Sequence, residues 1–276
     1  MISRVFVRIA PLAACLAVGA ARPAAGQGTP PMDPQRMGGA AMRALAILQS
    51  FQIANTPELS AAVAEVLSDS NAHMKMGPRR PATRADSARA VDIVKTARAA
   101  LSKYKDVKVA EQDGYIEFMP WLTDQPIYHY NNLPNVLATL QGFDATKPVS
   151  LLYKKNPKGE LQLVGVMYSA APVATNEDLD MRLPISIAHW HEHVNFCGPD
   201  PRAVSNGAVK VDAASTVKWV KITTKEACDA AGGRFVPRLF GWMAHVYLFA
   251  GSDDPKVIWG GDDHGSMDVH MHHPPE

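Results

Sequence analysis

The sequence predicts an α+β fold, in which N-terminal helices precede a mostly antiparallel sheet with short helices. Between residues 40 and 115, apolar side chains recur at the spacing of a helix face. From residue 126 onward they gather instead in short runs bounded by Gly, Pro and Asn. We therefore expect a single domain over residues 40–261, with a helical part at 40–115 and a sheet-rich part at 126–261.

Capping residues and apolar spacing predict helices at residues 40–54, 57–70, 84–104, 106–113 and 223–231. Pro57 stands at the first position of the second helix, where its fixed φ angle suits a helix start. Thr83 and Asp86 resemble a capping box at the start of the third helix, which also has the clearest apolar face. The last helix begins with Thr-x-x-Glu and is expected to end at Gly232, because glycine is favoured just after a helix.

Short apolar runs predict strands at residues 126–131, 149–154, 161–168, 209–211, 217–222, 234–236 and 243–249. The second and third runs are joined by Asn-Pro-Lys-Gly at residues 156–159, a sequence typical of a hairpin turn. Consecutive strands joined in this way pair antiparallel, which supports the predicted type of sheet.

Both ends of the chain are expected to lie outside the fold. Residues 1–26 have the pattern of a Sec-type signal peptide, with Arg4 and Arg8 before a short apolar run and small residues up to Gly26. A lipoprotein signal that anchors the chain through Cys15 is the alternative. Residues 27–39 are predicted to be a flexible lead-in, and residues 262–276 a loose tail that contains His and Met. We expect a periplasmic or secreted protein with no transmembrane segment in the mature chain.

Charge and motifs narrow the classes of partner. The formal net charge is +1 at pH 7, and the dense basic group of Arg79, Arg80 and Arg84 is interpreted as a solvated loop before a helix. We therefore expect a small molecule or a metal ion as partner, and no nucleic acid. The sequence also lacks the usual motifs of serine hydrolases, P-loop and dinucleotide-binding proteins and thioredoxins, which weakens those interpretations.

Two cysteines, Cys197 and Cys228, remain if Cys15 leaves with the signal peptide. In an exported chain they are expected to form one disulfide. Closing that loop would stabilise the fold by about 3–4 kcal/mol in the chain-entropy model. Thiolate ligation of a metal together with histidines is the less favoured alternative in an oxidising compartment.

Residues 189–193 read His-Trp-His-Glu-His and place His189, His191 and His193 within five positions. If residues 185–196 form a helix, Pro184 begins it and the Gly-Pro pair at 198–199 ends it, and this interpretation is favoured. If they form a strand, the three histidines share one face, and His245 on a neighbouring strand is the expected fourth ligand.

Imidazole is the commonest protein ligand for metals, so the cluster predicts a site for a divalent metal, either zinc or copper. His73 and His129 are further candidate ligands. His73 is followed by Met74 and Met76, and the combination of imidazole with thioether suits copper. The alternative is that these histidines are structural, hydrogen-bonded residues.

The sequence leaves open whether the protein is an enzyme. With an open coordination position, metal-assisted hydrolysis or hydration is the simplest chemistry. The other interpretation is a non-catalytic protein of the periplasm that binds copper or zinc, or an interaction domain with structural histidines.

Three short motifs carry a resemblance. They are His-Met-x-Met from residue 73, Trp-His-x-His-Val-Asn from residue 190 and Cys-Asp-Ala-Ala-Gly-Gly from residue 228. Together they resemble a set of uncharacterised exported bacterial proteins, over most of the mature chain. The resemblance implies export and no particular activity.

Overall fold

The computed structural model describes residues 57–68, 72–122 and 125–260. The helices are α2 (Pro57–Ser68), α3 (Arg84–Leu101), the 3-10 helix η2 (Ser102–Lys105), α4 (Val107–Gln112), α5 (Leu133–Ala138), α6 (Asn176–Arg182), α7 (Pro201–Ser205), α8 (Ala213–Val220), α9 (Lys225–Ala230) and α10 (Pro255–Ile258). The strands are β1 (Met74–Met76), β2 (Ile116–Glu117), β3 (Tyr128–Asn131), β4 (Ser150–Lys155), β5 (Leu161–Ala170), β6 (His191–Pro199), β7 (Gly233–Arg238) and β8 (Trp242–Val246).

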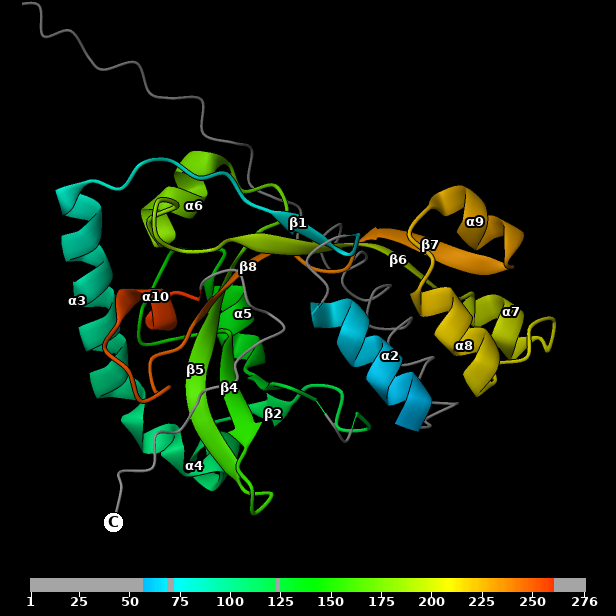
Figure 1. The fold of residues 1–276 in the computed structure, drawn as a ribbon, viewed down its shortest axis with the longest axis horizontal. Coiled ribbons are helices and arrows are strands. Elements are labelled where there is room, and N and C mark those ends of the chain that lie inside the picture. Colours follow the sequence, from blue (N-terminus) through cyan, green and yellow to red (C-terminus); the bar gives the residue numbers. More distant parts are fainter. Residues whose placement is uncertain (1–56, 69–71, 123–124, 261–276) are drawn as a thin grey trace, which may run out of the picture.

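The strands form one antiparallel sheet, and the predicted α+β class is confirmed. Its order is β1-β6-β8-β5-β4-β3-β2, and β7 pairs with the far end of β6. The long strand β6 runs across the molecule, with α3, α6 and α10 around one half and α2, α7, α8 and α9 around the other (Figure 1). Because β6 pairs with β1, β8 and β7 along its length, it ties the two halves together.

Each half has its own buried core. The larger core packs α3 and α6 against one face of the sheet, with Ala97, Leu151 and Trp190 almost completely buried. A second core joins α2 to α8 and β6, with Val63 and Val220 at its centre. A third apolar group, which lines the opposite face of the sheet, contains Val149, Leu152, Met167, Met243 and Tyr247.

The predicted helices after residue 56 are present. Thr83 caps α3, and a full capping box with Asp86 is formed, because each side chain accepts a hydrogen bond from the other residue's backbone N–H. The helix over 57–70 appears as α2, and that over 106–113 as α4. The helix predicted at 223–231 is α9, but it is capped by Thr224, one residue later than the Thr-x-x-Glu pattern indicates. The predicted helix over 40–54 lies outside the described residues.

Three predictions about secondary structure were wrong. Residues 185–196 do not form the favoured helix: a turn at 185–187 leads into β6. Hydrogen bonding to β1, β7 and β8 favours the extended backbone there, over the local signals for a helix. Residues 217–222, predicted as a strand, belong mostly to α8, which is capped by Asp212 and buries Trp219 and Val220. Residues 209–211 form no strand.

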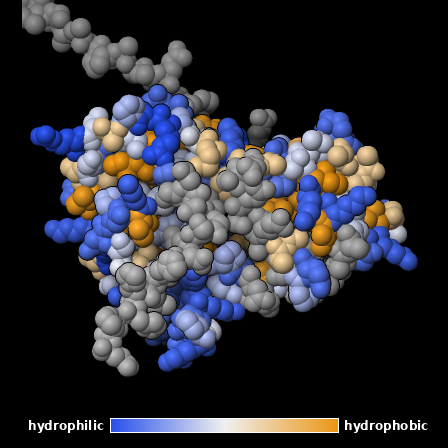
Figure 2. Space-filling view, viewed as in Figure 1, coloured by the Kyte–Doolittle hydropathy of each residue, from blue (hydrophilic) through white to orange (hydrophobic). Residues whose placement is uncertain are grey.

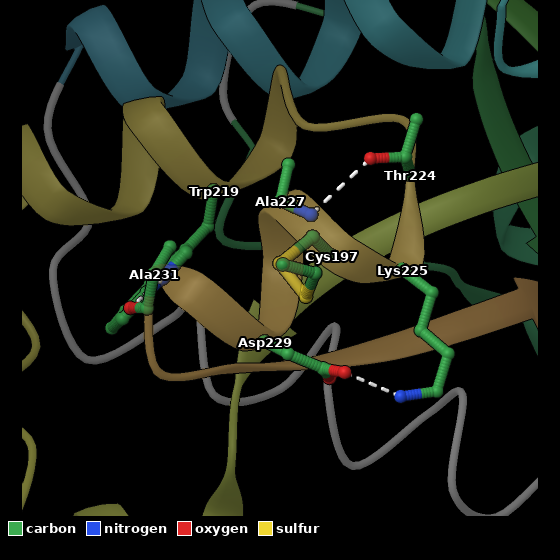
Figure 3. Close-up of a disulfide and its surroundings, with 8 residues drawn as sticks. Cys197, Trp219, Thr224, Lys225, Ala227, Asp229 and Ala231 are labelled. Carbon is green, nitrogen blue, oxygen red and sulfur yellow. Dashed lines mark hydrogen bonds and ion pairs between the residues drawn. A yellow bond between two sulfur atoms is a disulfide. The ribbon is translucent and has the colours of Figure 1, made fainter.

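Cys197 in β6 and Cys228 in α9 form a disulfide, as the sequence predicts (Figure 3). Both cysteines are completely buried beside Trp219, whose indole N–H donates to the carbonyl of Ala231. A Cβ atom at Gly233 would lie 2.6 Å from the Cys197 sulfur, so glycine is required where β7 passes the disulfide. The bridge therefore fixes α9 and β7 to the far end of β6.

The surface of the described residues mixes polar and apolar side chains. Hydrophilic residues form most of the rim in the view of Figure 2, and smaller hydrophobic spots appear on both halves. Within the described ranges, no helix is both long enough and apolar enough to cross a membrane. The predicted signal peptide, lead-in and tail lie outside these ranges.

Candidate metal centre

His129 and His245 approach each other across the sheet. Their Nε2 atoms lie 3.5 Å apart, and their ring centres are separated by 5.4 Å. Ordinary N–H hydrogen bonds have donor–acceptor distances of roughly 2.7–3.2 Å, so this contact is long for a direct hydrogen bond. Two imidazoles bound to one tetrahedral ion, at metal–nitrogen distances of about 2.0–2.1 Å, have their nitrogens about 3.3 Å apart. The observed spacing is close to that value.

The approach of these two histidines requires a strongly curved sheet. In the strand order, β5 and β4 lie between β8, which carries His245, and β3, which carries His129. Neighbouring strands lie about 4.8 Å apart, so the two backbones would be separated by about 14 Å in a flat sheet, with parallel side chains. The imidazoles can meet only because the face that carries them is concave.

His191 and His193 lie on β6 and extend this group. The rings of His191 and His245 are 5.2 Å apart between centres, and those of His191 and His193 are 5.5 Å apart. Rings bound to one tetrahedral ion have centres about 5 Å apart, from the same metal–nitrogen distance. We call His129, His191, His193 and His245 the histidine group.

Two members of the histidine group are buried, and the other two, His129 and His245, are half-buried. His191 is 1 % exposed and His193 is 8 % exposed. His191 Nδ1 lies 3.2 Å from the carbonyl oxygen of His189. Because a carbonyl only accepts hydrogen bonds, a neutral His191 that makes this contact as a hydrogen bond carries its proton on Nδ1 and its lone pair on Nε2. A backbone carbonyl that fixes the tautomer in this way is the usual support of a metal-binding histidine.

Methionines flank three members of the histidine group in the strand register. Met243 lies directly opposite His191, and Met167 lies directly opposite His245. On the other side of β6, Met76 and Met74 of β1 are the register partners of His191 and His193. Residues directly opposite in antiparallel strands present their side chains on the same face.

The sequence interpretation missed Met167 and Met243. A local signal for one of them exists, because Met243 and His245 alternate along β8 and so share one face, and Tyr247 follows at the same spacing directly after the strand. Tyr247 contacts His245, with ring centres 6.2 Å apart, and burial raises the pKa of its phenol to about 12. Tyr247 is therefore a neutral neighbour of the group at physiological pH.

Two other candidate ligands are placed differently. His189 precedes β6, and its Nε2 atom accepts a hydrogen bond of 2.7 Å from the Arg79 side chain. His73, which is 3 % exposed, packs its ring on Phe196, with centres 5.0 Å apart. His193 contacts the same phenylalanine at 6.3 Å. The structure thus brings together His129, His191, His193 and His245, and places His73 next to them across Phe196.

Glu192 lies between His191 and His193 in sequence but points to the opposite face of β6. Its side chain is 0 % exposed and forms ion pairs with Arg238, at 2.9 Å, and with Lys75, at 3.4 Å. A buried carboxylate requires such cationic partners. Glu192 therefore stabilises β6 on the face opposite to the histidine group.

Within residues 57–68, 72–122 and 125–260, no three His, Cys, Asp or Glu side chains are placed so that they converge on one metal ion. The ring contacts run from His129 to His245, then to His191 and then to His193. They link the four imidazoles in a line rather than around one point. No protein-family model, curated protein or solved structure matches this chain. The resemblance to exported bacterial proteins therefore stays a prediction.

Proposed function

We propose that this protein binds a zinc or copper ion through the histidine group, with His129 and His245 as the primary pair. The observation that carries the proposal is the 3.5 Å separation of their Nε2 atoms. The two strands that carry these residues are not neighbours, so the sheet must hold its curvature to keep the nitrogens together. We expect a sheet to keep such curvature where the two facing imidazoles bind the same ion.

His191 is the proposed third ligand. Its ring lies beside that of His245, and its lone pair is on Nε2 because the carbonyl of His189 fixes the tautomer. Nε2 is therefore the nitrogen of His191 that would bind the ion together with the primary pair. His193, next along the line, supplies a further imidazole or supports His191.

The proposal is metal binding and not a particular reaction. Metal-assisted hydrolysis also uses a base beside the metal-bound water. Glu192, the carboxylate adjacent to His191 and His193 in sequence, is ion-paired on the other face of β6.

The disulfide between Cys197 and Cys228 supports an oxidising compartment for the protein, and hence export.

Titration calorimetry with Zn²⁺ and Cu²⁺ on the full mature chain tests the proposal. His264, His270, His272 and His273 are replaced by alanine in every sample, so that the tail contributes no imidazole. We expect His129→Ala and His245→Ala each to weaken binding by at least about tenfold, since each removes one nitrogen of the primary pair. His189→Ala is the matched control and is expected to bind as tightly as its parent, because His189 faces Arg79.

Each other result overturns the proposal. A parent protein that binds neither metal shows that the histidine group is structural. Equal losses in all three variants show that binding does not depend on the His129–His245 pair. Thermal unfolding of the metal-free variants, measured in parallel, separates loss of a ligand from loss of the fold.

A further inference from the structure

The geometry points to copper, and to Cu(I) in particular, as the ion that this site takes, with the thioethers of Met243 and Met167 among its ligands. This inference rests on the proposed function, because it assigns two more ligands to the same site. Its basis is the register of the strands, in which each of these methionines stands directly across from a histidine of the group.

The pairing of methionine with histidine recurs along this face of the sheet. The chain has 12 methionines among 276 residues, and four of them are the direct register partners of His191, His193 and His245. Side chains directly opposite on antiparallel strands have their Cβ atoms about 4.5–5.5 Å apart. A flexible thioether on one strand can therefore reach an ion held by the imidazole on the next.

The donor set suits Cu(I) better than zinc. Structural zinc sites take a closed tetrahedral set of Cys, His, Asp or Glu ligands, and a methionine thioether is not among them. Thioether sulfur is a soft donor that selects Cu(I), and imidazole also suits copper. Two facing imidazoles with two thioethers beside them give a mixed nitrogen and sulfur set of four donors.

The exposure of these side chains also provides a route for the ion. Across β1, β6 and β8, the directly opposed residues are Met76, His191 and Met243, which are 45 %, 1 % and 5 % exposed. The row therefore begins with a thioether at the surface and ends inside the protein. Met167 on β5, the strand next to β8, stands opposite His245 and is 8 % exposed. A metal site needs an entry path, and this row supplies one that is itself made of copper ligands.

Anaerobic competition with a chromophoric Cu(I) chelator measures the affinity directly. The probe is Cu(I) kept reduced by ascorbate, and the protein is the full mature chain with the tail histidines replaced by alanine. The variants are Met243→Leu and Met167→Leu, because leucine keeps the volume and apolarity of methionine and removes only the sulfur. Met181→Leu, at an exposed position on α6, is the control.

We expect each of the two variants to weaken Cu(I) binding at least about tenfold, and to change Zn²⁺ binding by less than about twofold, because only copper favours the thioether. Met181→Leu is expected to match its parent. Unchanged Cu(I) affinity in both variants would show that the methionines only pack, and would overturn this inference while the His129 and His245 variants still test the proposed function. Equal losses of Cu(I) and Zn²⁺ would overturn it as well, because they would report a distorted site.

X-ray absorption spectroscopy at the copper edge gives a second readout. The Cu(I)-loaded parent is expected to show sulfur in the first coordination shell, with a smaller sulfur contribution in each leucine variant. A shell of nitrogen and oxygen alone in the loaded parent contradicts the assignment, whatever the affinities are.

Discussion

The Nε2 atoms of His129 and His245 lie 3.5 Å apart, although the two residues are 116 positions apart in the chain. Two intervening strands separate them in the sheet, so only curvature of β3, β4, β5 and β8 can bring the rings together. Everything proposed above for metal binding depends on this relationship.

Loss of the disulfide is expected to destabilise the protein without altering the histidine group. The Cys197 and Cys228 bridge closes a loop with a sequence separation of 31 residues. Replacing both cysteines by alanine should lower the free energy of unfolding by about 3–4 kcal/mol, from the loop entropy of the unfolded chain. Denaturant unfolding of the oxidised parent and the double variant measures the difference. Equal midpoints would show that the bridge adds no stability.

The Asp86 carboxylate is expected to make stability depend on pH. Its hydrogen bonds from Arg80, and then from the Thr83 backbone, hold its pKa well below the usual range. A lowered folded-state pKa means that the stabilisation is present above the unfolded pKa of about 3.9 and is lost as the pH falls toward the folded value.

Asp86→Asn removes this carboxylate. The variant should unfold at lower denaturant concentration than its parent at pH 7, and the gap should narrow progressively below about pH 4. Denaturant titrations at several pH values check this. Asp92→Asn, on the exposed side of the same helix, is the control. A gap that stays constant from pH 7 to pH 3 would contradict the role assigned to the Asp86 charge.

Removing Arg238 is expected to leave the buried Glu192 carboxylate with Lys75 as its remaining cationic partner of the two described here. Glu192 is 0 % exposed, and the Arg238 Nε atom lies 2.9 Å from it. Arg238→Ala should destabilise the fold by roughly 1–3 kcal/mol, the usual cost of a buried polar group that loses a partner. Arg234→Ala, on the same strand opposite Gly198, should change stability less. Equal effects of the two substitutions would show that the ion pair is unimportant for β6.

Local signals predicted much of the fold. The capping residue Thr83 and the turn at 156–159 act through contacts within a few positions, so the sequence reveals α3 and the β4–β5 hairpin. The predictions of a helix at residues 185–196 and a strand at residues 217–222 were wrong because contacts distant in sequence decide the structure there. Pairing of β6 with three other strands and burial of Trp219 by α8 are tertiary effects, which override local preference.

The site was predictable only in part. The alternation of His191 and His193, with His245 on a neighbouring strand, follows from the strand interpretation of that segment. The pairing of His129 with His245 depends on curvature accumulated over four strands, which no short pattern encodes. The opposition of Met243 to His191 depends on register between distant strands, and it becomes visible only in the sheet.

Anomalous diffraction from crystals of the metal-loaded protein tests whether His129 and His245 bind the same ion. Data collected at the zinc and copper edges locate each ion without assumptions about affinity. We expect a peak between β3 and β8, about 2.0–2.3 Å from the Nε2 atoms of both His129 and His245. Peaks confined to the histidines after residue 261, or a loaded crystal with no peak at the His129–His245 pair, would contradict it.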